Sequence, residues 1–101
     1  SAISISKDEQ LKGMIKNSTI AESRFLDSLG MSESEREDKL LKDIVIKAKQ
    51  KKKNLEKDTG IELSISEEDI KEFVREVEVN RNDYDKDNDN DNQEEEEKGN
   101  K

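Results

Sequence analysis

The strongest helix signals of the chain lie between Ser32 and Gly60, where the sequence reads SESEREDKLLKDIVIKAKQKKKNLEKDTG. Ser32 and Glu35 have the spacing of a capping box, in which a hydroxyl and a carboxylate each accept a backbone N–H at a helix start. Gly60 suits the helix end, because glycine readily adopts the left-handed conformation found there. Apolar residues recur with the helical period of 3.6 residues at Leu40, Leu41, Ile44, Ala48 and Leu55. The stretch therefore predicts a long amphipathic helix over 33–58.

A second helix is predicted upstream, over 7–29. Ser6 and Glu9 form another capping box, and Gly30 can end the helix in a left-handed conformation. If the helix is continuous, one face carries Leu11, Met14, Ile15, Ser18, Ala21, Phe25, Leu26 and Leu29. Ile20 points away from that face. The alternative is a break at 17–19 with a new cap at Thr19, which would give four helices; we favour the continuous helix.

A third helix is predicted over 67–79, downstream of the long one. Ser66 begins it, acidic residues in the first turn complement the positive helix end, and Ile65 can pack on Ile70 as a hydrophobic staple. Its apolar stripe consists of Ile70, Phe73, Val74 and Val77. The alternating residues of 61–65 fit either a short strand or an extended linker. A strand there would pair with Ile3 and Ile5 in a small ribbon.

Composition limits the size of the folded part. Hydrophobic residues make up 28% of the 101 residues and charged residues 46%, which is close to the composition of disordered chains. From Asn80 onward the chain consists almost entirely of Asn, Asp, Glu and Lys. We therefore expect one small helical domain over 1–79 and a disordered, acidic, low-complexity tail over 80–101. The predicted fold class is all-α, a small bundle of three helices, or of four if the break at 17–19 occurs.

Catalytic chemistry is not expected. The chain contains neither histidine nor cysteine, so it lacks the usual general bases, nucleophiles and soft metal ligands at neutral pH. Asp83, Asp85, Asp87 and Glu94 match four positions of a calcium loop, but Asn90 replaces an aliphatic residue and no amphipathic exit helix follows. We expect a protein that is not an enzyme and has no metal, no cofactor and no small-molecule substrate.

Neither a membrane span nor a signal peptide is indicated by the apolar residues, which occur in short stretches. The expected location is intracellular, either cytoplasmic or nuclear. Small accessory proteins of phages and plasmids often have this general build.

Charge is segregated along the chain. Residues 47–57 contain six lysines and one glutamate, whereas residues 62–78 and 83–101 are both strongly acidic. Lys51 and Lys52 fall on the apolar side of the long helix. This placement predicts that the helix projects beyond the core after Ala48.

A lysine stripe lies opposite the apolar face of the long helix, with one aliphatic residue, Ile46, among its members. The lysine stripe consists of Lys39, Lys42, Lys49, Lys53 and Lys57. Such a stripe can follow the phosphates of a nucleic acid. It lacks the arginines that read bases and the aromatics on which bases stack. Any nucleic-acid binding would be weak and non-specific.

The leading functional hypothesis is a small regulatory or assembly adaptor. The thin apolar core and the outward-facing Ile46 suggest that the helices bind another protein, or a second copy, through an apolar surface. The candidate partner-binding residues are Leu40, Ile44, Ile46, Phe73 and Val77. One alternative is a nucleic-acid-associated protein that uses the lysine stripe and is modulated by the tail. Another is an acidic nucleic-acid mimic that inhibits a nucleic-acid enzyme.

Overall fold

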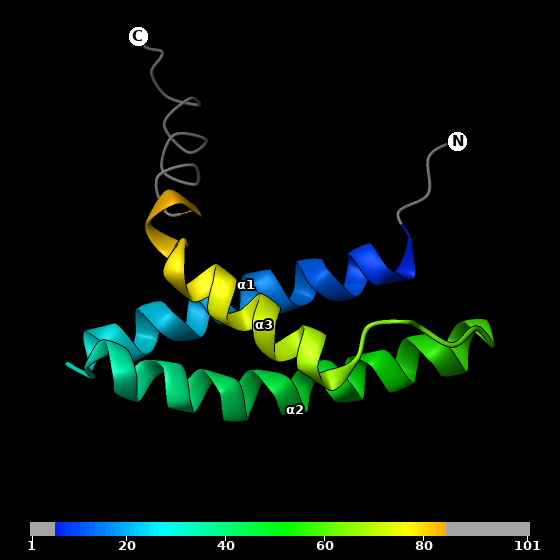
Figure 1. Ribbon diagram of the computed structural model, residues 1–101, viewed down its shortest axis with the longest axis horizontal. Helices are drawn as coiled ribbons and strands as arrows, with labels where there is room; N and C mark the ends of the chain where they lie inside the picture. Colours follow the sequence, from blue (N-terminus) through cyan, green and yellow to red (C-terminus); the bar gives the residue numbers. More distant parts are fainter. Residues whose placement is uncertain (1–5, 85–101) are drawn as a thin grey trace, which may run out of the picture.

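The computed structural model describes residues 6–84 and contains three helices, α1 Lys7–Ser28, α2 Glu33–Thr59 and α3 Glu67–Val79 (Figure 1). α1 and α2 run antiparallel, and α3 crosses in front of both (Figure 1). Each helix contacts the other two. Within the described residues there is no strand, so the predicted all-α three-helix bundle is confirmed.

Serine caps start all three helices. The Ser32 hydroxyl accepts the Glu35 backbone N–H at 3.2 Å, and the Glu35 carboxylate accepts the Ser32 N–H at 3.0 Å. Ser66 and Asp69 exchange the same pair of bonds, and the Ser6 hydroxyl accepts the Glu9 N–H at 3.2 Å. Because these bonds are local, the sequence pattern predicts every helix start.

Glycine serves the ends of α1 and α2. Gly60 has a φ of 71° and donates its N–H to the Glu56 carbonyl at 2.8 Å, closing α2 as predicted. Gly30, which also has a positive φ, follows α1 directly after Leu29. α1 is continuous through 17–19, so the predicted alternative with a break and a fourth helix does not occur.

The face that α1 turns inward differs from the predicted one. Leu11, Ile15 and Leu26 are buried as expected. Phe25 and Leu29, however, are 59% and 61% exposed, and Ala21 is also exposed, so these three assignments to the inward face were wrong. The residues buried in their place are Thr19, Ile20 and Ser23. The inward face is thus rotated toward small polar side chains, and Ile20, predicted to point away, is covered.

The core is a single seam shared by the three helices. Leu40, Ile44, Ala48 and Leu55 of α2 are buried in it, which confirms the predicted apolar face of that helix. Ile70 and Val74 enter from α3, and Ile65, which precedes α3, is buried in the same cluster as Ile70, as the staple predicted.

The linker between α2 and α3 is extended and folds back along α2. Leu63 and Ile65 are buried, and Ile61 is exposed. Glu56 of α2 accepts the Leu63 N–H at 2.9 Å, and Lys52 donates to the Ile65 carbonyl at 2.6 Å. The prediction that α2 projects beyond the core after Ala48 was therefore wrong, because the linker covers its second half. The proposed ribbon with Ile3 and Ile5 lies outside the described residues.

Charged side chains close one end of the bundle. The Glu78 carboxylate of α3 accepts the Ser23 hydroxyl at 2.6 Å and lies 3.3 Å from Nε of Arg36. Arg81 donates to the Ser23 hydroxyl at 2.9 Å and to Asp27 at 3.1 Å, and Arg36 lies 3.3 Å from the other Asp27 oxygen. We call these five residues the polar cluster. They join α1, α2, α3 and the chain that follows α3.

The packed body continues past the predicted boundary at residue 79. Residues 81–84 form a short helical turn. Arg81 joins the polar cluster, and the Lys16 ammonium lies 4.6 Å from the centre of the Tyr84 ring. Arg81 and Tyr84, assigned to the tail from the sequence, therefore contact α1. The rest of the predicted disordered tail, residues 85–101, lies outside the described residues.

Candidate interaction surfaces

The predicted partner-binding residues do not share one surface. Leu40, Ile44 and Val77 are fully buried in the bundle, so they are core residues and cannot contact a partner in this conformation. Phe73 is partly buried and packs against the core. Only Ile46 is well exposed, at 68%. The prediction is thus corrected for Leu40, Ile44 and Val77. Core residues and interface residues of a helix follow the same apolar periodicity, so the sequence pattern did not distinguish them.

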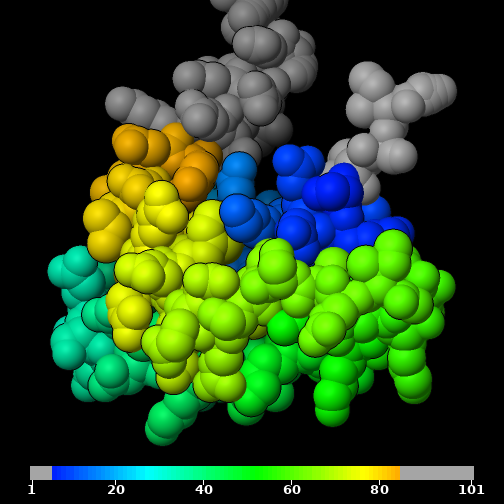
Figure 2. Space-filling view, turned by 45° about the vertical axis from the view of Figure 1, so that its right-hand side comes forward, coloured from blue at the N-terminus to red at the C-terminus, as the bar shows by residue number. Residues whose placement is uncertain are grey.

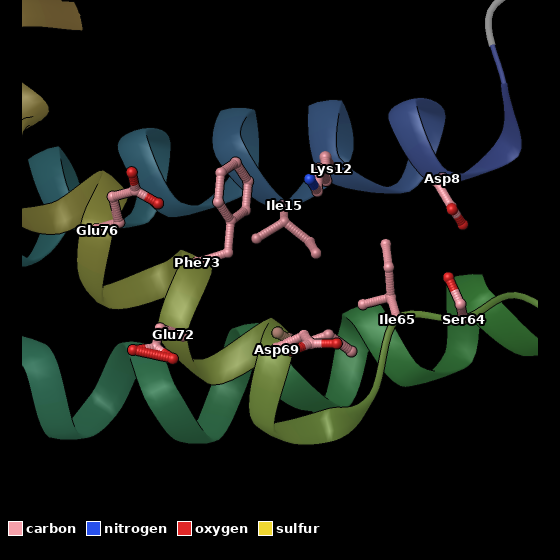
Figure 3. Close-up of a pocket in the computed structure, with 10 residues that line it drawn as sticks. Asp8, Lys12, Ile15, Ser64, Ile65, Asp69, Glu72, Phe73 and Glu76 are labelled. Carbon is pink, nitrogen blue, oxygen red and sulfur yellow. The ribbon is translucent and has the colours of Figure 1, made fainter.

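A groove lies between the first half of α1 and α3, with the linker at one end (Figure 3). We call it the α1–α3 groove; its volume is about 420 Å³. In the space-filling view, α1 and α3 meet along the face on which it opens (Figure 2). Its apolar lining is Ile15, Ile65, Ile70 and Phe73, and its polar rim is Asp8, Lys12, Ser64, Asp69, Glu72 and Glu76.

The rim of the groove is predominantly acidic. Four carboxylates face one ammonium group, that of Lys12, which lies 5.9 Å from the centre of the Phe73 ring. Hydrogen bonds with Ser66 lower the pKa of Asp69 from its usual value, and Lys12 lowers it further. Glu72 and Glu76 are exposed, and neither side chain has an ion-pair partner in the part of the chain that the structure describes. Their charges are therefore available to a ligand.

Asp8 stands at the linker end of the groove, opposite Ser64 (Figure 3). Its Oδ1 atom is shielded from water and finds no hydrogen-bond partner among residues 6–84. An unpaired, desolvated polar atom costs about 1–3 kcal/mol. Asp8 is also among the residues that line the groove, so its carboxylate adds negative charge at the linker end.

The lysine stripe lies on the outer surface of α2, as predicted. Lys39 pairs with Asp43 at 3.4 Å on the same helix. Lys49 pairs with Glu67 of α3 at 3.0 Å, and this hydrogen bond lowers the pKa of Glu67. The other members, Lys42, Lys53 and Lys57, are exposed and make no ion pair within residues 6–84. Two of the five lysines in the stripe therefore pair with carboxylates of the protein itself.

A shallow hollow of about 180 Å³ accompanies the stripe, lined by Ile46, Lys49, Gln50 and Lys53. It is smaller than the α1–α3 groove and has a single aliphatic side chain. The lysine stripe therefore offers charge with little apolar surface to a partner.

Two carboxyl groups meet between α1 and α2. Burial raises the pKa of Glu22, and a hydrogen bond with Asp43 raises it further. The same bond lowers the pKa of Asp43, helped by Lys39 and Lys47. The pair therefore shares a proton at acidic pH and repels at neutral pH.

Two kinds of site are absent from the described part of the chain. Residues 6–84 contain no group of three Asp or Glu side chains placed to hold a metal ion. None of the helices there has the length and apolar character needed to cross a bilayer.

Sequence reasoning missed both the α1–α3 groove and the polar cluster. Phe73 was named as a contact residue, and the spacing of Glu72 and Glu76 on one helix was visible. No sequence signal links Ser23 to Glu78, which lies 55 positions away.

Comparisons of the chain with protein-family models, with curated proteins and with solved structures found no match.

Proposed function

We propose that the protein is a small, non-enzymatic adaptor that binds a segment of another protein in the α1–α3 groove. The observation that carries the proposal is an open groove of about 420 Å³ with an apolar floor and unpaired carboxylates on its rim. Binding sites of proteins commonly combine an apolar lining with a few polar groups that orient the ligand.

The groove is built mostly on helices, and the linker supplies Ser64 and Ile65. Ile15 and Ile70 are 1% exposed and held in the core, so the floor is in place before any ligand arrives. Phe73 is partly buried and adds an aromatic wall. Burying one partner side chain of the size of leucine gains about 1.5–3 kcal/mol. Because the floor is preformed, little of that gain is lost to ordering the site.

A random peptide display selection against the full chain tests this proposal. Selected peptides should shift the amide NMR signals of Lys12, Glu72 and Phe73. The Ser64→Trp variant, which places a large ring at the groove, should lose binding, whereas Ser34→Trp at an exposed position of α2 should retain it. Peptides that bind both variants equally, or a selection that yields no binder, would contradict the proposal.

A second candidate function is nucleic-acid association through the lysine stripe. It is favoured by Lys42, Lys53 and Lys57, which are exposed on one helix and unpaired within residues 6–84. Binding to a labelled DNA duplex should fall steeply with salt. The triple exchange of these lysines to glutamine should abolish it, while glutamine at Lys7, Lys12 and Lys16 of α1 should not. Equal effects of the two triple variants would count against this candidate.

The acidic-mimic hypothesis rests on the tail, residues 85–101, outside the described residues. No structural observation favours it over the two candidates above.

A further inference from the structure

We propose that the partner segment bound in the α1–α3 groove is a short basic segment, in which an apolar side chain lies between lysine or arginine side chains. This inference rests on the proposed function, since it names the class of ligand for the same groove. The charge of the rim and the chemistry of the floor together carry it.

The floor of the groove selects an apolar group. Ile15, Ile65 and Ile70 present only carbon atoms in their side chains, and all three belong to the buried core cluster. In the close-up, the Phe73 ring and Ile15 extend into the same space from α3 and α1 (Figure 3). A ligand without an apolar group would leave the floor in contact with water and would gain no free energy from the hydrophobic effect there. The floor therefore requires an aliphatic or aromatic side chain on the ligand.

The rim selects positive charge. Glu72 and Glu76 lie one helical turn apart beside Phe73, and neither is neutralised by a side chain of the described residues. At the other end of the groove, Asp8 adds a further carboxylate to the lining. Basic groups at both ends of the ligand would face carboxylates, with the apolar group between them.

Lys12 indicates the chemistry that the groove accepts. Its ammonium lies 5.9 Å from the centre of the Phe73 ring, within the range of a cation–π contact. The protein thus already places one cation of its own over the ring, at an exposed position. A lysine or arginine of the partner would compete with Lys12 for that place.

A second hollow serves as an internal comparison. It has a volume of about 230 Å³ and lies between the start of α2 and the end of α3. There Arg75 lies 3.6 Å from Glu37, and both residues line the hollow, so this carboxylate is already paired with a cation of the protein. The α1–α3 groove differs because its rim carboxylates at Glu72 and Glu76 are not offset in this way. Charge complementarity therefore assigns the basic ligand to the groove.

The test uses three fluorescein-labelled synthetic peptides and the full chain. The first has the order Gly-Lys-Leu-Arg-Ile-Lys-Gly, the second replaces each basic residue by glutamine, and the third replaces each by glutamate. Fluorescence polarisation should show the basic peptide binding about 10-fold or more tightly than the neutral one. The acidic peptide should bind still more weakly, and added salt should reduce the difference.

Substitutions in the rim separate groove binding from general attraction to an acidic protein. The double variant Glu72→Lys with Glu76→Lys should weaken the basic peptide roughly 10-fold or more. The matched control, Asp38→Lys with Asp58→Lys on exposed positions of α2, changes the net charge equally and should cost less than about 3-fold. Lys12→Gln should strengthen binding about 3-fold, because it removes the competing cation.

The outcomes distinguish the two proposals. If the neutral peptide binds as tightly as the basic one and Ser64→Trp abolishes both, the adaptor proposal stands and the basic ligand is wrong. If the double variants Glu72→Lys with Glu76→Lys and Asp38→Lys with Asp58→Lys weaken binding of the basic peptide equally, the attraction is non-specific and the inference is overturned. Sedimentation equilibrium at the same concentrations should show a monomer. A dimer that the peptide dissociates would mean that a second copy occupies the groove, which also overturns the inference.

Discussion

At one end of the bundle, charged side chains from all three helices meet in the polar cluster, whereas at the other end the helices meet through aliphatic side chains and leave the α1–α3 groove open. Glu78, at the closed end, is 7% exposed and bonded to Ser23 and Arg36. Leu11, at the open end, has no exposed surface. Figure 1 shows the two ends at opposite sides of the view.

The contrast between the two ends explains how so few apolar residues give one arrangement of α3. Aliphatic contacts are not directional, so the open end alone would allow α3 to slide. The carboxylate of Glu78, held by a hydroxyl and a guanidinium, has directional partners on α1 and α2. We infer that the polar cluster sets the position of α3 and thereby the shape of the groove.

The largest effect is expected at the open end. Leu11→Ala should lower the free energy of unfolding by about 3 kcal/mol, because it leaves a cavity in a fully buried position. The matched exchange Leu29→Ala on the same segment removes a side chain that is 61% exposed. It should change stability by less than about 0.5 kcal/mol in urea unfolding. Equal losses for the two leucines would show that the α1 face is oriented differently.

The closed end should be nearly as sensitive. Glu78→Ala removes the shared acceptor of Ser23 and Arg36, which should cost about 2–3 kcal/mol. Glu76→Ala, at an exposed position two residues earlier, is the control and should be close to neutral. Urea denaturation of both variants measures the difference. A loss at Glu78 no larger than at Glu76 would remove the directional role of the polar cluster.

Between the two ends lies the hydroxyl oxygen of Thr19, which lowers the stability of the folded state. Thr19 is fully buried, and its hydroxyl oxygen has no hydrogen-bond partner in the described part of the chain. Thr19→Val keeps the shape and removes the unpaired group, so it should stabilise the protein by about 1 kcal/mol. Thr59→Val is the control, since the Thr59 hydroxyl donates to the Leu55 carbonyl at 2.9 Å. If both variants destabilise, Thr19 has a partner in solution.

The smallest effect concerns the carboxyl pair between α1 and α2. The pKa of Glu22 is raised above its usual 4.5, so the folded state holds this proton more tightly than the unfolded state. That contribution is complete below pH 4.5 and is lost as the pH rises through the raised pKa. Glu22→Gln keeps an uncharged donor to Asp43 at every pH.

The Glu22→Gln variant should therefore match the parent protein at acidic pH and exceed its stability by about 0.3 kcal/mol at pH 7, given solvent screening. Asp43 acts in the opposite sense: its pKa is lowered, so its contribution is lost as the pH falls below its usual 3.8. Thermal unfolding across pH 3–7 measures both. A gain from Glu22→Gln that is constant with pH would contradict the shared proton.

Local signals explain what could be predicted from the sequence. Ser32 and Glu35 cap a helix by bonds that span three residues, so the pattern alone is sufficient. The same holds for Ser66 and for the left-handed Gly60. All three helices were predicted for this reason.

Partners distant in sequence explain what could not be predicted. Ser23 is buried because Glu78, Arg81 and Arg36 gather around it, and hydrophobic periodicity gives no weight to a serine. Hydrophobic periodicity also assigned Phe25 to the core, although this residue is exposed. The groove depends on where α3 crosses α1, which these polar bonds decide.

The most direct test of the whole account is a nuclear Overhauser spectrum of the full chain without any partner. The account predicts cross-peaks from the Tyr84 ring to the side chain of Lys16, and from the Phe73 ring to the side chain of Lys12. These pairs join the middle of α3, and the turn that follows α3, to residues of α1 that are distant in sequence. Absence of both sets, with amide signals clustered as in an unfolded chain, would contradict a bundle and groove that form without a partner.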